Sequence, residues 1–366
     1  MVKIIGGTKM TQLTRFQEAL KNAGAKCALI SSELNIRYLC GFNYTDGYLL
    51  ISTDRAYLIT DFRYIEAAKA AVKNFEIVMP RGNMLNEINS LLKQNGVSTL
   101  LVEEDELSLA AHKRLSSVFE GVELVAGASV ILKNNREIKL AYEIDTIDRA
   151  QRITDAAFDH ILGYITPERT ELDVALELEF FMRKMGAEAL AFDTIAVSGK
   201  ASSLPHGVPS AEKLSQGFLT MDFGAKYEGY CSDMTRTIVL GRADDEMKKV
   251  YNTVLTAQKA ALEALHEGIV CRDADKIARD IITEAGYGEN FGHSLGHGVG
   301  MFIHESPRLA SSAPESSVLC RGNVVTVEPG IYLEGKYGCR IEDMVAIDLD
   351  GSVRNFTKSP KELIEL

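Results

Sequence analysis

No apolar run in this 366-residue sequence approaches the length of a membrane-spanning helix. The N-terminal residues 1–10 also lack the long apolar core and the small-residue cleavage site of a secretory signal. The cysteines form no CxxC pair and are scattered along the chain, at Cys27, Cys40, Cys231, Cys271, Cys320 and Cys339. In a chain of this length, such spacing predicts reduced thiols rather than a disulfide framework. We therefore expect a cytoplasmic protein that has no membrane partner.

Basic tracts are absent as well. Lysine and arginine number 40 against 51 aspartates and glutamates, which gives a formal net charge of −11. A chain with this balance and no clustered basic residues is not expected to bind nucleic acid or anionic lipid. Part of the negative charge would be neutralised if some of the carboxylates bind cations. The sequence shows no internal repeat and no low-complexity segment.

The chain is longer than a single hydrophobic core normally supports, which predicts two domains. In the first third, the expected elements are helices over residues 11–24 and 83–95 and strands over 27–32, 48–53, 56–62 and 99–104. Their alternation predicts an α/β N-terminal domain, residues 1–132. This domain contains only His112 and no converging carboxylates, so we expect it to serve architecture, assembly or access control. The polar sequence KNNRE, residues 133–137, is interpreted as a short connection.

The second domain, residues 133–366, is predicted to combine several helices with antiparallel strands in an α+β arrangement. Thr170 and Asp173 have the spacing of a capping box at the start of one of these helices. The expected helices cover 138–161, 171–185, 244–266 and 273–285, and the expected strands cover 192–199, 217–224, 230–240, 323–329 and 339–347.

Asp222 lies within the otherwise apolar sequence FLTMDFG, although aspartate is disfavoured in strands because its side chain competes for backbone hydrogen bonds. A single such residue would most simply be a turn-proximal aspartate that bonds backbone amides. Asp233 weakens that interpretation, because residues 218–237 are expected to form two strands joined by a tight turn. Two buried carboxylates side by side repel, and each raises the pKa of the other unless a cation lies between them.

Two glutamates repeat this arrangement further along the chain. Glu328 ends the apolar strand in VVTVEPG, and Glu342 lies in RIED, again in a strand–turn–strand context. His297 lies in GHSLGHGVG, where the glycines allow the backbone to approach a ligand closely. Alone, a glutamate at a strand end is most often solvated, and a histidine in such a loop is usually not a ligand. Taken with the two aspartates, these side chains predict a metal site.

Two divalent cations would balance four ionised carboxylates, while a neutral imidazole adds no charge. A ligand set that is rich in oxygen and includes one imidazole suits Mn²⁺, Co²⁺ or Zn²⁺. Two such ions about 3.5 Å apart would lower the pKa of a shared water and polarise a carbonyl group. The site is therefore predicted to hold two divalent metal ions, with manganese favoured, and to hydrolyse an amide.

The motifs around these residues resemble those of the pita-bread metallopeptidase family, which includes methionine aminopeptidase, aminopeptidase P and prolidase. The family's metal ligands are all present here: Asp222 in MDFG, Asp233 in SDMTRT, His297 in GHGVG, Glu328 in VEPG and Glu342 in RIED. The resemblance implies that Asp222 chelates one metal and that Asp233 and Glu342 bridge the two. It also implies that His297 and Glu328 complete the second metal.

The resemblance covers nearly the whole chain, and the N-terminal domain is typical of the Xaa-Pro-cleaving branch. SSLPHG, GHGVG and HESPRL are most similar to aminopeptidase P and prolidase. The implied architecture is an α/β N-terminal domain followed by an α+β pita-bread catalytic domain. The implied function is hydrolysis of Xaa-Pro peptide bonds by a metal-bridging hydroxide, in an aminopeptidase or a dipeptidase. The substrate would be a peptide with proline after its N-terminal residue, and the enzyme a homodimer assembled partly through the first domain.

The resemblance also assigns roles beyond metal binding. His206 would contact the substrate near the scissile amide, and His304 would bind the scissile carbonyl or stabilise the tetrahedral intermediate. Glu328 would relay a proton to the leaving nitrogen. Arg308 resembles a position that binds the carboxylate of short substrates, although a solvated loop arginine is an equal alternative. Arg340, expected on the same strand face as the last ligand, resembles an arginine that pairs with the aspartates or lines the pocket.

Two rival functions occur on this fold. Creatinase-like amidinohydrolases and non-catalytic binding proteins share it, but those relatives do not keep the complete ligand set, so the five intact ligands favour a peptidase. The spacing does not distinguish a dipeptide substrate from a longer peptide. Cys231, two residues before Asp233, is expected to face the site unless it is a small space-filling residue.

Overall fold

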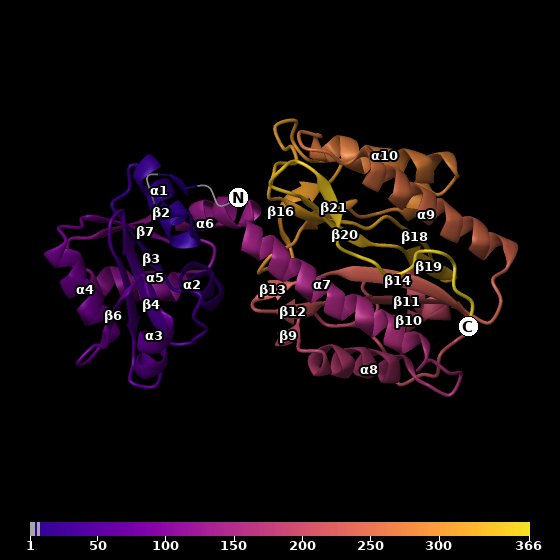
Figure 1. Ribbon diagram of the computed structural model, residues 1–366, viewed down its shortest axis with the longest axis horizontal. Helices are drawn as coiled ribbons and strands as arrows, with labels where there is room; N and C mark the ends of the chain where they lie inside the picture. The colour runs from indigo at the N-terminus through magenta and orange to yellow at the C-terminus, as the bar shows by residue number, and fades with distance from the viewer. Residues whose placement is uncertain (1–3, 6–7) are drawn as a thin grey trace. The chain divides into compact units, whose positions relative to one another are not determined.

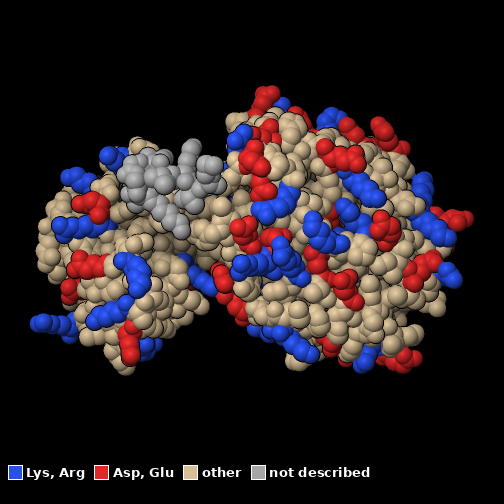
Figure 2. Space-filling view, viewed as in Figure 1, with Lys and Arg blue, Asp and Glu red and all other residues tan. Residues whose placement is uncertain are grey.

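The computed structural model describes residues 4–5 and 8–366 and separates into two compact units, residues 1–136 and 137–366. Residues 1–3 and 6–7, part of the segment inspected above for a secretory signal, lie outside the described residues. Every helix of the described chain is too short or too polar to cross a membrane. Figure 2 shows acidic and basic side chains interspersed over the face in view.

A six-stranded mixed sheet forms the centre of the N-terminal unit, in the order β6-β5-β4-β3-β7-β8 (Figure 1). β4 pairs antiparallel with both β3 and β5, whereas the pairs β5–β6, β3–β7 and β7–β8 are parallel. The strands are β3 (Cys27–Ile30), β4 (Gly47–Ser52), β5 (Ala56–Thr60), β6 (Glu76–Val78), β7 (Thr99–Val102) and β8 (Glu123–Ala126). Two short strands, β1 (Ile4–Ile5) and β2 (Thr8–Lys9), pair with each other ahead of this sheet.

The helices of this unit connect the strands and include both helices predicted from the apolar periodicity. The helix predicted over residues 11–24 begins after the N-cap Thr11 and ends before Gly24, whose φ of 68° favours glycine. The helices are α1 (Gln12–Asn22), α2 (Glu33–Cys40), α3 (Ile65–Ala71), α4 (Met84–Gln94), α5 (Leu109–Val118) and α6 (Ala128–Glu137). Of these, α2, α3 and α5 were not predicted, because they are short and carry a weaker apolar pattern.

The interpretation of KNNRE as a short connection is wrong, because these residues form the second half of α6. The run is polar, with Lys133 and Asn134 exposed and the next two residues turned inward. Asn135 and Arg136 are buried, and Arg136 donates a hydrogen bond to the Asn35 side chain. A helix that buries polar side chains has no apolar periodicity, so its sequence pattern resembles that of a loop.

Four helices surround the strands of the C-terminal unit, close to the predicted ranges. They are α7 (Ala141–Leu162), α8 (Glu171–Lys184), α9 (Asp245–Ala264) and α10 (Cys271–Glu284). α7 packs with α8 and α9 packs with α10 (Figure 1). The capping box predicted before α8 is confirmed, since the Thr170 side chain accepts from the Asp173 amide and the Asp173 side chain accepts from the Thr170 amide. A helix pair followed by paired strands thus occurs twice, although the sequence shows no repeat.

The strands of this unit form several antiparallel sheets. The sheet orders are β10-β11-β14, β13-β12-β9, β16-β15-β17-β20-β21 and β18-β19. Their strands are β9 (Ala189–Leu190), β10 (Ile195–Ser198), β11 (Gly217–Phe223), β12 (Ala225–Tyr227), β13 (Tyr230–Cys231), β14 (Met234–Leu240), β15 (Gly296–Gly298), β16 (Glu305–Leu309), β17 (Val324–Val327), β18 (Gly330–Leu333), β19 (Tyr337–Arg340), β20 (Asp343–Ile347) and β21 (Val353–Asn355). The 3₁₀ turns η1 (Gly199–Ser203) and η2 (Gly288–Asn290) interrupt the longer connections.

In two strand pairs, a hairpin is inserted in the chain between the two paired strands. β11 pairs with β14, and the hairpin β12–β13 lies between them in the chain. β17 pairs with β20, and the hairpin β18–β19 lies between those. The strands predicted over 230–240 and 339–347 are therefore each split in two, because the chain leaves one sheet and enters another.

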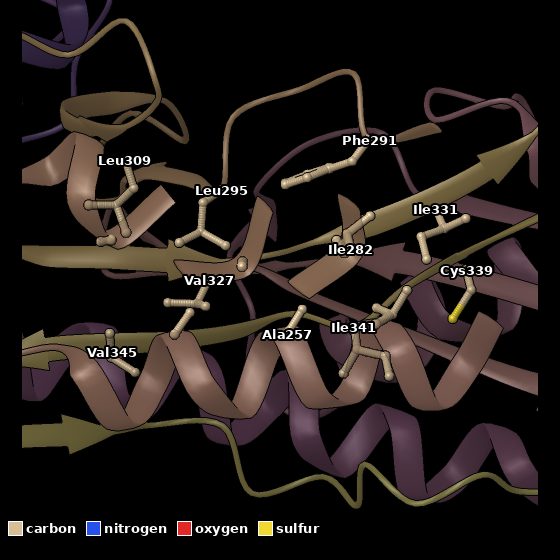
Figure 3. Packing of buried hydrophobic residues seen from close by; sticks show 14 of the residues in the cluster. Ala257, Ile282, Phe291, Leu295, Leu309, Val327, Ile331, Cys339, Ile341 and Val345 are labelled. Atoms are coloured by element: carbon tan, nitrogen blue, oxygen red, sulfur yellow. The ribbon is translucent and has the colours of Figure 1, made fainter. Parts of the chain in front are cut away.

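An apolar core lies between α9, α10 and the adjoining strands. Figure 3 shows side chains of this cluster, among them Ala257, Ile282, Val327 and Ile341. Cys339 lies in the same cluster with no exposed surface, and burial raises the pKa of its thiol to about 12. It therefore acts as a small apolar side chain. This packing fixes the sheets at whose ends the functional residues lie.

Candidate metal centre

A cavity of about 840 Å³ opens in the C-terminal unit, at the ends of the interrupted strand pairs. Every residue predicted to belong to the site lines this cavity. They are His206, Asp222, Asp233, His297, His304, Arg308, Glu328, Arg340 and Glu342. The structure thus brings together side chains that come from positions 206–342 of the chain.

The four carboxylates lie where the strand pairs give way to their inserted hairpins. Asp222 is near the end of β11, opposite Thr235 of β14, and Asp233 lies between β13 and β14. Glu328 follows the last residue of β17, and Glu342 precedes β20. Asp222 keeps the regular alternation of β11, whereas the strand breaks release Asp233, Glu328 and Glu342 from it, and all four side chains line one cavity.

His297 lies in the short strand β15, between two glycines. A Cβ atom on Gly296 would lie 2.0 Å from the Thr326 carbonyl oxygen, and one on Gly298 would lie 2.2 Å from the Ser306 carbonyl oxygen. No side chain fits at such distances. The glycines therefore allow neighbouring strands to approach closely, which holds His297 at the cavity wall.

The hydrogen bonds of His297 fix its tautomer. Its Nδ1 atom lies 3.1 Å from the Gly298 carbonyl oxygen, which can only accept, so Nδ1 carries the proton. The Nε2 atom, with its lone pair, lies 3.5 Å from both Asp233 Oδ2 and Glu328 Oε1. Burial lowers the pKa of this imidazole to about 4. A neutral imidazole with a free Nε2 is the form that binds a metal.

The carboxylates carry more negative charge than their protein surroundings balance. Burial raises the pKa of Asp233 and of Glu342 well above the usual range, and the neighbouring carboxylates raise both further. Burial raises the pKa of Glu328 to about 8. Asp222 Oδ1 is buried and has no hydrogen-bond partner among the residues that the structure describes. Uncompensated acids and an orphaned oxygen fit a site for divalent cations.

Three ligand atoms already lie within reach of a single ion. One atom each from Asp233, His297 and Glu342 lie within 4.8 Å of one another. Thr235 Oγ1 donates to Glu342 Oε2 at 2.8 Å and fixes the orientation of that carboxylate. The donor set of oxygen atoms with one imidazole therefore fits the divalent ions expected from the sequence.

Arg340 links the ligands to the cavity wall. Its Nη2 atom donates to Asp222 Oδ2 at 2.7 Å, and its Nε atom donates to Thr235 Oγ1 at 2.9 Å. Arg340 ends β19, whereas Glu342 lies beyond that strand, so the prediction that they share a strand face is wrong. They meet at the cavity because the chain bends at the junction between two sheets.

His293 and Tyr332 also line the cavity and were missed in the sequence. Arg340 Nη1 donates to the Tyr332 hydroxyl at 2.6 Å, and that hydroxyl lies 3.0 Å from His293 Nε2. Burial lowers the pKa of His293 to about 4, and Arg340 lowers it further, so the ring is neutral. Its Nδ1 atom donates to the Ser294 carbonyl oxygen at 2.9 Å, which leaves Nε2 to accept a hydrogen bond from the Tyr332 hydroxyl. The spacing of His293 four residues before His297 was a signal for it, whereas nothing local marks Tyr332.

His304 and Arg308 approach the cavity from one segment and His206 from another. The His304 and His297 rings meet edge to face, with centroids 4.5 Å apart. Burial lowers the pKa of His304, and the positive charge of Arg308 lowers it further. His206 lies in the segment between β10 and β11. These side chains face the ligand set without belonging to it.

Cys231 is a space-filling residue and does not face the site. Its thiol donates to the Met301 carbonyl oxygen at 3.6 Å, and the side chain does not line the cavity. Burial raises the pKa of this thiol to about 12. A neutral, buried thiol of this kind is unreactive.

Comparison with known proteins follows the division of the chain into two units. Residues 145–348 match metallopeptidase family M24, and residues 12–138 match the creatinase/prolidase N-terminal domain. The chain belongs to family M24. A peptidase of Bacillus subtilis, described as uncharacterized, is 43% identical over 97% of this chain and 100% of its own length.

Two solved structures of the family share the whole fold. The Xaa-Pro dipeptidase from Bacillus anthracis is 44% identical, with a TM-score of 0.92 over 97% of this chain and 99% of its own. The X-Pro aminopeptidase from Thermotoga maritima is 37% identical, with a TM-score of 0.89 over 95% of this chain and 100% of its own. The predicted fold class, an α/β domain followed by a pita-bread catalytic domain, is confirmed.

Proposed function

We propose that this M24 protein hydrolyses Xaa-Pro peptide bonds. Two divalent ions, manganese in preference to cobalt or zinc, would be held by Asp222, Asp233, His297, Glu328 and Glu342. The observation that supports the proposal best is the meeting of these four carboxylates and one neutral imidazole in a single cavity. Bound divalent ions supply Lewis acidity, because they lower the pKa of water and polarise a carbonyl group.

The chain's own groups around the ligands suit amide hydrolysis. His304 and His206 line the cavity, where a ring N–H can donate to the scissile carbonyl oxygen as negative charge develops. A Glu328 oxygen can carry a proton to the leaving nitrogen. Arg340 holds Asp222 in place through its 2.7 Å ion pair.

The cavity also offers features for a short peptide that contains proline. A proline nitrogen carries no hydrogen in the peptide bond, so the wall around it needs no acceptor there. Phe192, Val208 and Ile303 line the cavity and provide apolar surface for such a ring. Arg308 lines it as well and can pair with the terminal carboxylate of a short substrate.

The test compares substrates on protein that has been stripped of metal and reconstituted with Mn²⁺, Co²⁺ or Zn²⁺. Hydrolysis of Ala-Pro and Ala-Pro-Ala is measured beside Ala-Ala, which lacks proline, and creatine, the substrate of the rival amidinohydrolase. The proposal predicts metal-dependent cleavage of the proline peptides, and the ratio of the two assigns a dipeptidase or an aminopeptidase. Cleavage of creatine alone, or no turnover with metal bound, would refute it.

The proposal also covers the oligomeric state and the cellular location of the protein. A homodimer is implied by the motifs it shares with the Xaa-Pro-cleaving enzymes, and a cytoplasmic location is proposed from the scattered cysteines. The six cysteines are all free, as a reducing compartment would keep them. Sedimentation at micromolar concentration is expected to give twice the 40.2 kDa mass of one chain.

A further inference from the structure

A buried glutamate outside the cavity connects both ends of the segment that carries His206. Glu171 is the first residue of α8 and is 4% exposed. Its Oε1 atom accepts from the Ser198 amide at 2.6 Å and from the Ser198 hydroxyl at 3.1 Å. Its Oε2 atom accepts from the Ser210 amide at 3.1 Å and from the Ser210 hydroxyl at 2.8 Å. Each carboxylate oxygen thus holds one serine.

These serines mark the two stems of a single loop, with His206 between them. Ser198 is the last residue of β10 and leads into the loop. On the returning stem, the Ser210 carbonyl accepts from the Leu172 amide at 2.9 Å. The Ser198 hydroxyl also accepts from the Ser215 amide at 3.0 Å, which joins the two stems directly. The Glu171 carboxylate therefore fixes the distance between the points where the loop leaves the fold and returns to it.

The tip of this loop has little packing of its own. Leu204 and Val208, on either side of His206, are 59% and 82% exposed. The tip is supported at Gly207, where a Cβ atom would lie 2.9 Å from a Val197 methyl group, and by a 3.3 Å hydrogen bond from Arg340 to the Pro205 carbonyl. Just before the tip, Ser202 is buried, and its hydroxyl accepts from the Gly338 amide at 3.0 Å. With so few contacts at the tip itself, the placement of the imidazole depends on this anchor and on the geometry of the stems.

We propose that Glu171 is a positioning residue for His206. It does not line the cavity, and it acts by holding Ser198 and Ser210 so that the loop presents the imidazole to the substrate. The inference rests on the proposed peptidase function for the role of His206, and on the observed contacts for the role of Glu171. Glutamine in its place keeps the shape but supplies only one accepting oxygen, so one serine would face an NH₂ group that cannot accept.

The N-terminal unit contains a matched control. Glu103 is buried, and its carboxylate accepts from the amides and hydroxyls of Ser31 and Ser32 and from the Asn35 side chain. Glu103→Gln disturbs the same type of serine-bound carboxylate at a place that carries none of the site residues. Any loss that Glu171→Gln shows beyond this control is specific to the His206 loop.

The first experiment measures kcat and KM on Ala-Pro with Mn²⁺ for wild type, Glu171→Gln and Glu103→Gln, with metal content determined for each. We expect kcat to fall roughly tenfold to a hundredfold in Glu171→Gln, the range for a small misplacement of a reacting group. The metal content of both variants and the kcat of Glu103→Gln are expected to stay within about twofold of wild type. Equal kcat in Glu171→Gln and wild type, or an equal loss in both variants, would overturn the inference.

A double-mutant cycle then tests whether Glu171 acts through His206. If it does, adding Glu171→Gln to His206→Ala changes kcat by less than about twofold, because the loop no longer carries the group it positions. Losses that multiply would overturn the inference, as would a His206→Ala variant with wild-type kcat. If Glu171→Gln fails to fold, Ser210→Ala replaces it, and a smaller loss that also vanishes in the His206→Ala background is expected.

Amide hydrogen exchange on the metal-free protein separates this inference from the proposed function. Residues 199–213 should lose protection in Glu171→Gln and keep it in Glu103→Gln, whatever the enzyme cleaves. Unchanged protection in this segment would refute the positioning role even if the wild type is an active peptidase. A different outcome is that Glu171→Gln loses protection in this segment while the wild type turns over no Xaa-Pro peptide. That result would refute the proposed peptidase function but would still show that Glu171 holds the loop.

Discussion

At the scale of the residue, the site depends on side chains that orient the ligands. Thr235 is the clearest example, because its hydroxyl donates to Glu342 and accepts from Arg340. Arg340 in turn holds Asp222 at 2.7 Å. One hydroxyl and one guanidinium thus connect two carboxylates that come from different sheets. Loss of such an orienting group typically costs roughly tenfold to a hundredfold in metal affinity.

Replacing Thr235 with valine should weaken metal binding without removing any ligand. The variant keeps the shape of the side chain but leaves Glu342 without its donor and the Arg340 Nε–H without its acceptor. We expect the Kd for Mn²⁺ to rise roughly tenfold to a hundredfold, as measured by calorimetric titration of metal-free protein. Thr235→Ser restores the hydroxyl and should bind as wild type does. An unchanged Kd in the valine variant would remove Thr235 from this network.

The sequence was most informative about residues that lie in compact motifs. The two aspartates, His297 and the two glutamates could be singled out because each is an acid in an apolar strand or a histidine among glycines. Tyr332 and Glu171 could not, because a tyrosine in a strand and a glutamate at a helix start are ordinary. Their contacts become visible only in the structure. Tyr332 meets Arg340 across the hairpin β18–β19, and Glu171 meets Ser198 and Ser210, which lie 27 and 39 residues further along the chain.

At the scale of the element, the site lies where strands are interrupted. Asp233 and Glu342 lie in short gaps between strands, at points where the chain passes from one sheet to another. The sequence predicted continuous strands there, because apolar and β-branched residues flank both acids. Which hydrogen-bonding partner each half adopts depends on the tertiary fold and leaves no local signal. The existence of the strands was therefore predictable and their breaks were not.

Substitution of a glycine beside His297 tests whether close packing of the strands positions this histidine. Gly296→Ala would place a methyl group 2.0 Å from the Thr326 carbonyl oxygen, so β15 must move away from β17 and take His297 with it. We expect a loss of roughly 1–3 kcal/mol in the free energy of unfolding, measured with urea, and weaker binding of Mn²⁺. Gly163→Ala is the control, since its methyl group would find no atom nearer than 3.7 Å, and a change within about 0.5 kcal/mol is expected. Equal behaviour of the two variants would contradict the packing role.

At the scale of the whole molecule, the fold class followed from length and alternation of elements. The α/β N-terminal unit and the strand-rich C-terminal unit are both present, and all nine predicted site residues line a cavity formed by the second unit alone. The net charge of −11 is partly explained by this cavity, because four carboxylates of the predicted ligand set line it together. Length and composition could not reveal that a helix pair followed by a strand pair occurs twice in the second unit, because the sequence shows no repeat.

Removing metal should destabilise the molecule. Without cations, the clustered carboxylates repel one another, and no side chain or amide in the described part of the chain donates to Asp222 Oδ1. Ions that bind only the folded chain add about 2.7 kcal/mol of stability at one hundred times their Kd. We expect Mn²⁺ to raise the melting temperature of metal-free wild type in calorimetry and to leave Asp233→Asn almost unchanged. An equal shift in both proteins would mean that the ion binds elsewhere.

The most direct test of the account is the number of ions that each chain binds. Metal-free protein is titrated with Mn²⁺, and bound metal is counted by mass spectrometry for wild type and for Asp233→Asn, which lacks one anionic ligand. The account predicts two ions per chain in the wild type, with fewer ions and no turnover of Xaa-Pro peptides in the variant. A wild type that binds no ion, or a variant that binds two and keeps full turnover, would contradict it.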